Sequence, residues 1–197
     1  FTKHLAYHIY PVSNGVWRRN VEMLRARLQL FDGVIVVAVV TDPPTGRKPD
    51  PTGPFPPDRG RHIPGCDSFD DVIAAFDAKR IEFIHRENDP ELREVATLIP
   101  MLERIPGGPR DVVLYAQAKG TTRHPGHIAH HWTRVMYEVY LDYWHVVEKA
   151  LEDYPCVGAF KKLGPGWQAE QTKSDWHYSG SFSWYRCADL FARDWRK

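Results

Sequence analysis

A lysine, a glycine and two threonines follow directly after an apolar stretch in the middle of the chain. Val112 to Tyr115 has the length and apolar character of a strand, and Gln117, Lys119 and Gly120 come soon after it. An ammonium group, flexible backbone and hydroxyl donors at one edge suit the binding of a phosphate or diphosphate. The alternative interpretation is an ordinary turn that carries a solvated lysine.

Carboxylate and amide side chains follow two other predicted strands. Asp42 comes after the unbroken apolar run 34–40, and Asn88 and Asp89 follow the run 81–85. Such groups at strand ends can accept hydrogen bonds from a ribose or a base edge. Asp42 before proline is equally typical of a turn, and Asp89 before proline is typical of a helix cap.

An aromatic segment near the end of the chain mixes flat rings with small hydroxyls. It runs from Trp176 to Arg186. Sugar sites use rings against C–H faces and polar groups against hydroxyls, so the segment is a candidate substrate site. The alternative is a core strand, because period two places Tyr178, Phe182 and Trp184 on one side. The candidate substrate-binding residues are Tyr178, Ser179, Ser181, Trp184 and Arg186.

Hydrophobic periodicity predicts strands and helices in alternation. The run 34–40 is apolar at every position, as a parallel strand buried between helix layers requires. The predicted strands are 5–10, 34–40, 81–85 and 112–115, and the predicted helices are 16–31, 67–76, 92–102, 129–154 and a short C-terminal one. This alternation predicts one α/β domain over 1–197 with a mostly parallel, Rossmann-like sheet flanked by helices. The stretch 43–65 holds eight of the 16 prolines and is predicted to be a loop.

Composition and missing motifs exclude several classes of protein. The net charge is +1, so there is no strong signal for nucleic-acid binding, and no apolar run approaches the roughly 20 residues of a membrane span. The motifs GxGxxG, GxxxxGK[ST] and GxSxG are missing, which argues against dinucleotide dehydrogenases, P-loop enzymes and α/β-hydrolases. Histidines at 124, 127, 130 and 131 have some metal-like spacing, but without a nearby carboxylate an exposed helix start is favoured.

The cysteines give an expectation about the cellular compartment, and the two ends of the chain give one about whether the sequence is full length. The three cysteines are widely separated and form no CxxC pair, so we expect reduced thiols and a cytoplasmic protein. The chain starts at Phe1 rather than Met, which indicates a trimmed start, and its end at Lys197 leaves room for a further acceptor subdomain.

The order of the motifs resembles that of rhamnan-synthesis-type glycosyltransferases. The matching elements are His8 to Pro11, Trp17 with Asn20, Asn88-Asp89 with Leu92 to Glu94, Tyr115 to Gly120, and Gly180 to Arg186. The resemblance covers nearly the whole chain and implies a GT-A-like fold that uses a nucleotide-sugar donor. It also implies a glycan or glycolipid hydroxyl as acceptor. The donor-binding residues expected on this basis are His8, Tyr10, Asp42, Asn88, Asp89, Gln117, Lys119 and Gly120.

Two departures from the family pattern matter for mechanism. Relatives read His-Thr-Lys-Gly where this chain has Gln-Ala-Lys-Gly at 117–120, and no acidic residue occurs between Val112 and Ala129, so the usual Asp-x-Asp metal motif is missing. We therefore expect no metal site and no required cofactor, in a transferase that is independent of Mn²⁺ or Mg²⁺ or depends on it only weakly, with Lys119 supplying the positive charge at the leaving diphosphate. The candidate general bases are Asp175 and His177, which flank the aromatic segment.

Two other functions remain open at the level of sequence. One keeps the sugar donor but transfers to a modified DNA base, for which Arg18, Arg19, Arg25 and Arg27 would supply a local basic face. The other is a sugar- or nucleotide-binding module without catalysis, which the missing metal motif favours. Hydrolysis of a nucleotide sugar without acceptor would separate an enzyme from a binding module.

Overall fold

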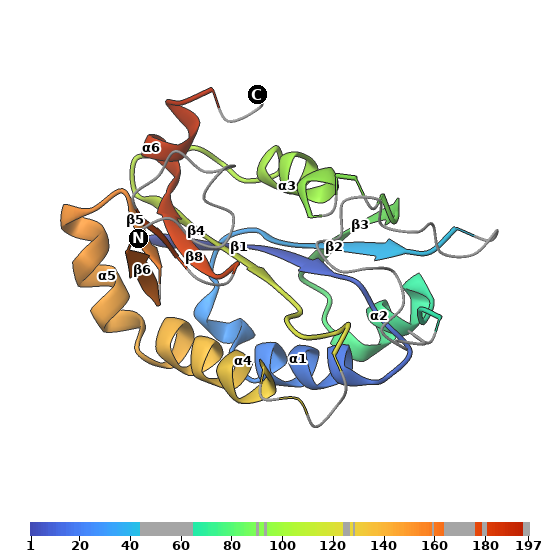
Figure 1. Cartoon of the computed structure of the whole chain (residues 1–197). Coiled ribbons are helices and arrows are strands. Elements are labelled where there is room, and N and C mark those ends of the chain that lie inside the picture. The colour runs from blue at the N-terminus through green and yellow to red at the C-terminus, as the bar shows by residue number, and fades with distance from the viewer. Residues whose placement is uncertain are drawn as a thin grey trace.

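The computed structural model describes residues 1–43, 65–89, 91–92, 94–123, 127, 129–158, 160–163, 176–178 and 181–194, with the backbone alone at 129, 161–163 and 176–178. Most of the predicted proline-rich loop, together with Asp175 and Ser179, lies outside these residues. Strands and helices alternate through the first part of the chain, as predicted (Figure 1). The elements are β1 (Thr2–Ile9), α1 (Val16–Arg25), the 3₁₀ turn η1 (Leu28–Leu30), β2 (Ile35–Thr41), α2 (Phe69–Phe76), β3 (Ile81–Glu87), α3 (Val95–Leu102), β4 (Asp111–Gln117), α4 (Ala129–Tyr137), the π-helical turn η2 (Glu138–Asp142), α5 (Trp144–Asp153), β5 (Cys156–Gly158), β6 (Lys161–Leu163), β7 (Trp176–Tyr178), β8 (Ser183–Arg186) and α6 (Cys187–Phe191).

Six of the described strands form one sheet in the order β3-β2-β1-β4-β8-β5. The first four are parallel to one another, and β8 is antiparallel to both β4 and β5. The mostly parallel α/β fold is thus confirmed. The strand order turns back at β1, because β2 and β3 lie on one side of it and β4 lies on the other. In such sheets ligands bind beside this reversal, at the carboxyl ends of the strands.

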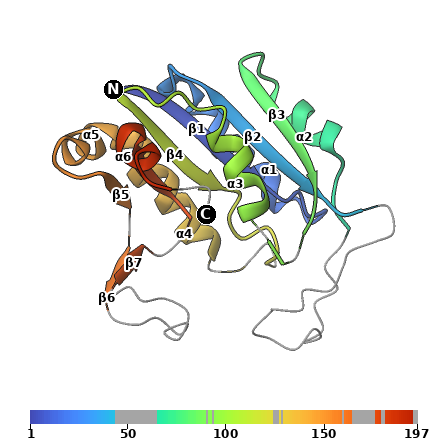
Figure 2. The same ribbon diagram turned by 90° about the horizontal axis from the view of Figure 1, so that it is seen from above.

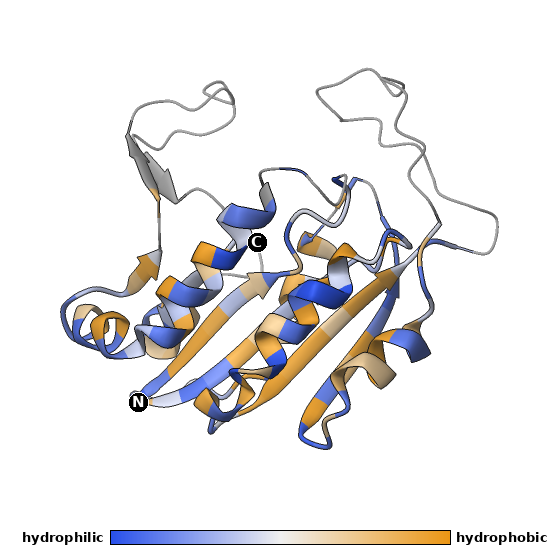
Figure 3. Cartoon of the chain, turned by 90° about the horizontal axis from the view of Figure 1, so that it is seen from below, coloured by the Kyte–Doolittle hydropathy of each residue, from blue (hydrophilic) through white to orange (hydrophobic). Residues whose placement is uncertain are grey.

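Helices cover both faces of the sheet. Figure 1 shows α1, α2, α4 and α5 on one face and α3 and α6 on the other, and Figure 2 shows α3 and α6 in front of the strands. Two hydrophobic clusters correspond to these layers, the larger under α1, α2 and α4 and the smaller under α3 and α6. β2 is buried at Ile35 through Val40 because it contributes to both clusters, and Figure 3 shows apolar colour along much of the central sheet.

The predicted helix 129–154 is wrong as one continuous element. Its first part, α4, passes into a π-helical turn in which Tyr143 N donates to Glu138 O, and α5 follows from Trp144. The indole Nε1–H of Trp184 donates to Tyr140 O at 3.2 Å inside this turn. A side chain that donates a hydrogen bond to a helix carbonyl interrupts the regular series of backbone hydrogen bonds, which explains the break. The helix predicted over 16–31 similarly ends at Arg25 and is followed by a 3₁₀ turn.

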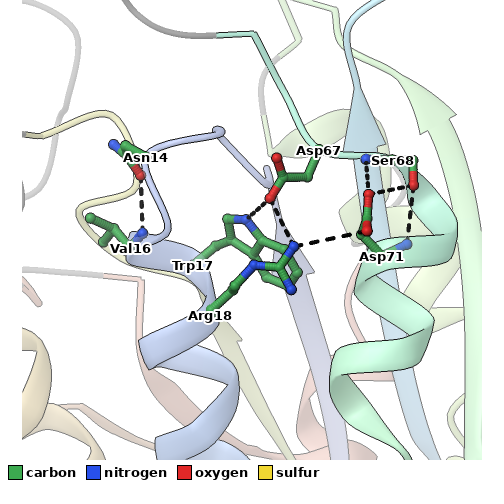
Figure 4. A network of polar contacts seen from close by, with 7 residues as sticks. All are labelled: Asn14, Val16, Trp17, Arg18, Asp67, Ser68 and Asp71. Carbon is green, nitrogen blue, oxygen red and sulfur yellow. Dashed lines mark hydrogen bonds and ion pairs between the residues drawn. The ribbon is translucent and has the colours of Figure 1, made fainter.

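A polar network joins the beginnings of α1 and α2 (Figure 4). The Trp17 indole donates to Asp67 Oδ2 at 2.9 Å, and Arg18 bonds the same oxygen at 3.2 Å. Ser68 forms a capping box with Asp71 at the start of α2. Because both helices begin at the carboxyl edge of the sheet, the network fixes their positions beside the candidate site.

Candidate functional site

Most of the predicted donor-binding residues belong to two groups of side chains at the carboxyl edge of the sheet. The first, here called the Asp42 cluster, contains Tyr10, Asp42 and Asn88 from the ends of β1, β2 and β3. The second, here called the Lys119 cluster, lies where β1 and β4 meet. It contains His8, Glu94, Thr97, Gln117, Lys119 and Ser181.

The Asp42 cluster orients one carboxylate from two sides. Tyr10 Oη lies 2.8 and 2.9 Å from the two carboxylate oxygens, and Asn88 Nδ2 donates to Oδ1 at 3.2 Å. The Asp42 backbone N–H also faces Cys66 Sγ at 3.0 Å, and burial raises the pKa of that thiol. A carboxylate has about four lone-pair positions, so these contacts leave Asp42 able to accept further bonds from a ligand.

The Lys119 cluster is organised around the amide of Gln117. In the amide orientation that satisfies all three neighbours, the Gln117 nitrogen donates to Glu94 Oε1 at 2.9 Å, and its oxygen accepts from Lys119 Nζ at 2.7 Å and from Ser181 Oγ at 2.8 Å. Residues from β4, from the turn before α3 and from the segment before β8 therefore meet at one amide. The ammonium of Lys119 is thus held in one place.

Burial and the Glu94 carboxylate shift the pKa values of residues in and beside the Lys119 cluster. Burial lowers the pKa of Lys119, while the nearby Glu94 carboxylate acts in the opposite direction. Burial also lowers the pKa of His8 to about 4, again opposed by Glu94. Burial raises the pKa of Tyr115, and Glu94 adds to that increase. At neutral pH His8 is therefore an uncharged ring, because its pKa lies near 4.

The tautomer of His8 follows from its hydrogen bond to α3. His8 Nδ1 lies 2.7 Å from Thr97 Oγ1, and that hydroxyl donates its own proton to Glu94 O at 3.0 Å. Thr97 Oγ1 must then accept from His8, so the proton of the neutral ring is on Nδ1. The other ring nitrogen, Nε2, is left as an acceptor.

Two asparagines hold the backbone after β4. Asn20 Oδ1 accepts from Lys119 N and its Nδ2 donates to Lys119 O, both at 3.2 Å. Asn14 Nδ2 donates to Thr121 O at 2.6 Å. Gly120 has φ 77°, a left-handed conformation that a glycine adopts without strain. The turn that carries Lys119 is therefore tied to α1 and to the segment before it.

Sequence reasoning assigned no role to Glu94, Thr97 or Asn20. Asn20 and Glu94 did belong to the motifs that carry the family resemblance. Asn20 also interrupts the apolar face of a helix and is only 1% exposed, which is a detectable signal because buried amides need partners.

Other predicted site residues lie apart from the two clusters or outside what is described. Asp89 accepts from the N–H groups of Glu91 and Leu92, so it stabilises a local turn and does not cap α3, whose N-cap residue is Glu94. His177 and Tyr178 belong to β7, which pairs with β6 in a separate two-stranded sheet whose side chains are not described.

Trp184 and Arg186 require a correction. Trp184 is fully buried, with its ring 5.8 Å from that of Phe31 and 4.7 Å from that of Trp144. It is a core residue, because an unexposed ring has no surface for a substrate. Arg186 pairs with Asp189 and donates to the carbonyl of Leu151 at 3.3 Å, which fixes the ends of β8 and α5.

Within the described residues, no three His, Cys, Asp or Glu side chains are grouped so that they could hold a metal ion. None of the helices described combines the length and apolar character needed to cross a bilayer. Comparison of the chain with models of protein families, with curated proteins and with solved structures finds no match.

Proposed function

We propose that the chain is a glycosyltransferase that moves a sugar from a nucleotide-diphosphate sugar to a hydroxyl acceptor, a glycan or glycolipid. The observation that carries the proposal is the ammonium of Lys119, held 2.7 Å from Gln117 beside the strand reversal. A fixed cation at this edge suits a diphosphate. A GT-A-like arrangement, which the order of motifs implies, is compatible with the sheet.

The Asp42 cluster supports a nucleoside at the neighbouring strand ends. In open α/β sheets an acidic side chain near the end of the second strand accepts bonds from ribose hydroxyls. Asp42 occupies that position, and Tyr10 and Asn88 already orient its carboxylate. The donor would then extend from a nucleoside at Asp42 to a diphosphate at Lys119.

Transfer in this arrangement needs one cation and one base. The acceptor oxygen forms a bond to the anomeric carbon, the bond from that carbon to the diphosphate oxygen breaks, and the acceptor proton passes to a base. Lys119, with the backbone N–H groups of Gly120 and Thr121, stabilises the charge that develops on the departing diphosphate. Asp175 and His177 stay the candidate bases.

Thermal-shift and hydrolysis measurements test the proposal. We expect one of UDP-, GDP- or dTDP-sugars to raise the melting temperature of the protein, and we expect slow release of free sugar without acceptor. Lys119→Gln should lose the stabilisation, whereas the exposed Lys79→Gln should retain it. The proposal fails if no nucleotide sugar stabilises the wild type, and binding without hydrolysis or transfer would indicate a non-catalytic module.

Metal dependence is tested on the same reaction. We expect turnover to continue in EDTA, because Lys119 supplies the positive charge at the diphosphate. Activity that EDTA abolishes and Mn²⁺ restores would contradict the role given to this lysine.

A further inference from the structure

A groove of about 300 Å³ lies between α1 and α4, on the face of the sheet opposite α3. Val16, Asn20 and Met23 form its wall on α1. These positions share one face of that helix, because they are separated by four and three residues. The two helices pack against each other along this face, so the groove is part of the described fold rather than of a surface loop.

The rim of the groove is rich in groups that bind anions. Arg19 and Arg134 line it together with His127, His130 and His131. Guanidinium groups offer forked N–H donors that match the oxygens of a phosphate or carboxylate, and imidazole nitrogens add further donors.

The two arginines differ in how far they are already neutralised. Arg134 forms an ion pair with Glu138 at 3.4 Å. Arg19 is exposed and forms no ion pair with any residue in the described part of the chain. Glu22 is the one acidic residue among those described in the lining. An anion in the groove would therefore find a guanidinium that no described carboxylate yet neutralises.

We propose that this groove is a binding site for a small anionic sugar, one that carries a phosphate or a carboxylate. The volume is at the low end of the range for ligand sites, which fits a single sugar ring better than a nucleotide. Met23, which is partly exposed, offers apolar surface to the C–H face of the ring, while Arg19 and the histidines bind its charged group. The inference goes beyond the proposed transferase and does not depend on it.

The groove is connected to the Lys119 turn through one side chain. Asn20 lines the groove and also bonds both the N–H and the carbonyl of Lys119. A ligand that shifts Asn20 would therefore be detected at the Lys119 amide, whose N–H donates directly to Asn20 Oδ1.

Calorimetric titration with three matched probes tests the proposal. Glucose 6-phosphate, glucuronate and neutral glucose differ in the charged group but share the ring. We expect one or both anions to bind and glucose not to bind, and the ratio of the two anion affinities distinguishes a phosphate site from a carboxylate site. Arg19→Gln should weaken anion binding about tenfold, as expected for loss of one charge-assisted contact.

Arg25→Gln is the matched control, because Arg25 is on the same helix but pairs with Asp77 at 3.7 Å and does not line the groove. Its anion affinity should equal that of the wild type. His131→Gln, a second variant on the opposite wall, should also weaken binding. The proposal is overturned if the wild type binds neither anion, if glucose binds as tightly as the anions, or if Arg19→Gln and His131→Gln leave the affinity unchanged.

Discussion

Acid should destabilise this protein through His8, and the size of the effect can be worked from the structure. His8 is 7% exposed, and burial lowers its pKa from 6.5 to about 4, against the opposing effect of Glu94. In the unfolded chain the ring takes up a proton near its ordinary pKa, whereas in the folded protein it does so only near pH 4. The unfolded state therefore binds more protons between these values, and folding stability falls as the pH drops.

The expected loss from this one side chain is about 2 kcal/mol between pH 7 and pH 5, and about 3 kcal/mol by pH 4. The variant His8→Asn removes the titration but keeps an amide nitrogen near Nδ1 to donate to Thr97. The difference between wild type and variant isolates His8, because His4 and the carboxylates titrate in both proteins.

Urea unfolding followed by tryptophan fluorescence measures this difference, and the chain has seven Trp residues as probes. The free energy of unfolding should fall more steeply with acid in the wild type than in His8→Asn, and the curves should run parallel above pH 7. Equal losses in the two proteins down to pH 4 would refute the assignment of His8 as a buried neutral ring. An NMR titration of its Cε1 proton gives the folded pKa directly.

Two further substitutions test the packing around the sheet and the start of α2. Gly33→Ala should destabilise the protein by about 1–3 kcal/mol in urea unfolding, because a Cβ there would lie 2.4 Å from Nδ1 of the buried His4 ring. Gly65→Ala is its control, since nothing lies within 4 Å of a Cβ at that position, and equal losses at the two glycines would contradict the steric reason. Ser68→Ala should cost about 1 kcal/mol through loss of the capping box with Asp71, whereas an unchanged unfolding midpoint would show that the cap is dispensable.

Local patterns in the sequence predicted the central elements well. The apolar run 34–40 indicated a strand buried on both faces, and β2 occupies that place. The sequence also placed Asp42 and Asn88 at the ends of two strands, where the structure has them, with Asn88 Nδ2 3.2 Å from Asp42 Oδ1. These predictions succeeded because periodicity and strand ends are determined by residues near one another in the chain.

The partners of Lys119 could not be predicted in this way. Glu94 and Ser181 reach Gln117 from segments far away in the sequence, and Ser181 does so because β8 pairs antiparallel with β4. No local pattern specifies that pairing. The same strand places Trp184 in the core. There the indole N–H of Trp184 donates to the carbonyl of Tyr140 and interrupts the helical segment that contains it.

The sequence by itself thus determined that this is an α/β chain with polar groups at its strand ends and a lysine after the fourth strand. Only the tertiary structure decided which groups surround that lysine, that His8 is neutral, and that Trp184 is a core residue. The physical reason is the distance along the chain between the residues that determine each property. Strand and helix periods are set by neighbouring residues, whereas the charge on a side chain and the surface that it exposes depend on burial by segments distant in the chain.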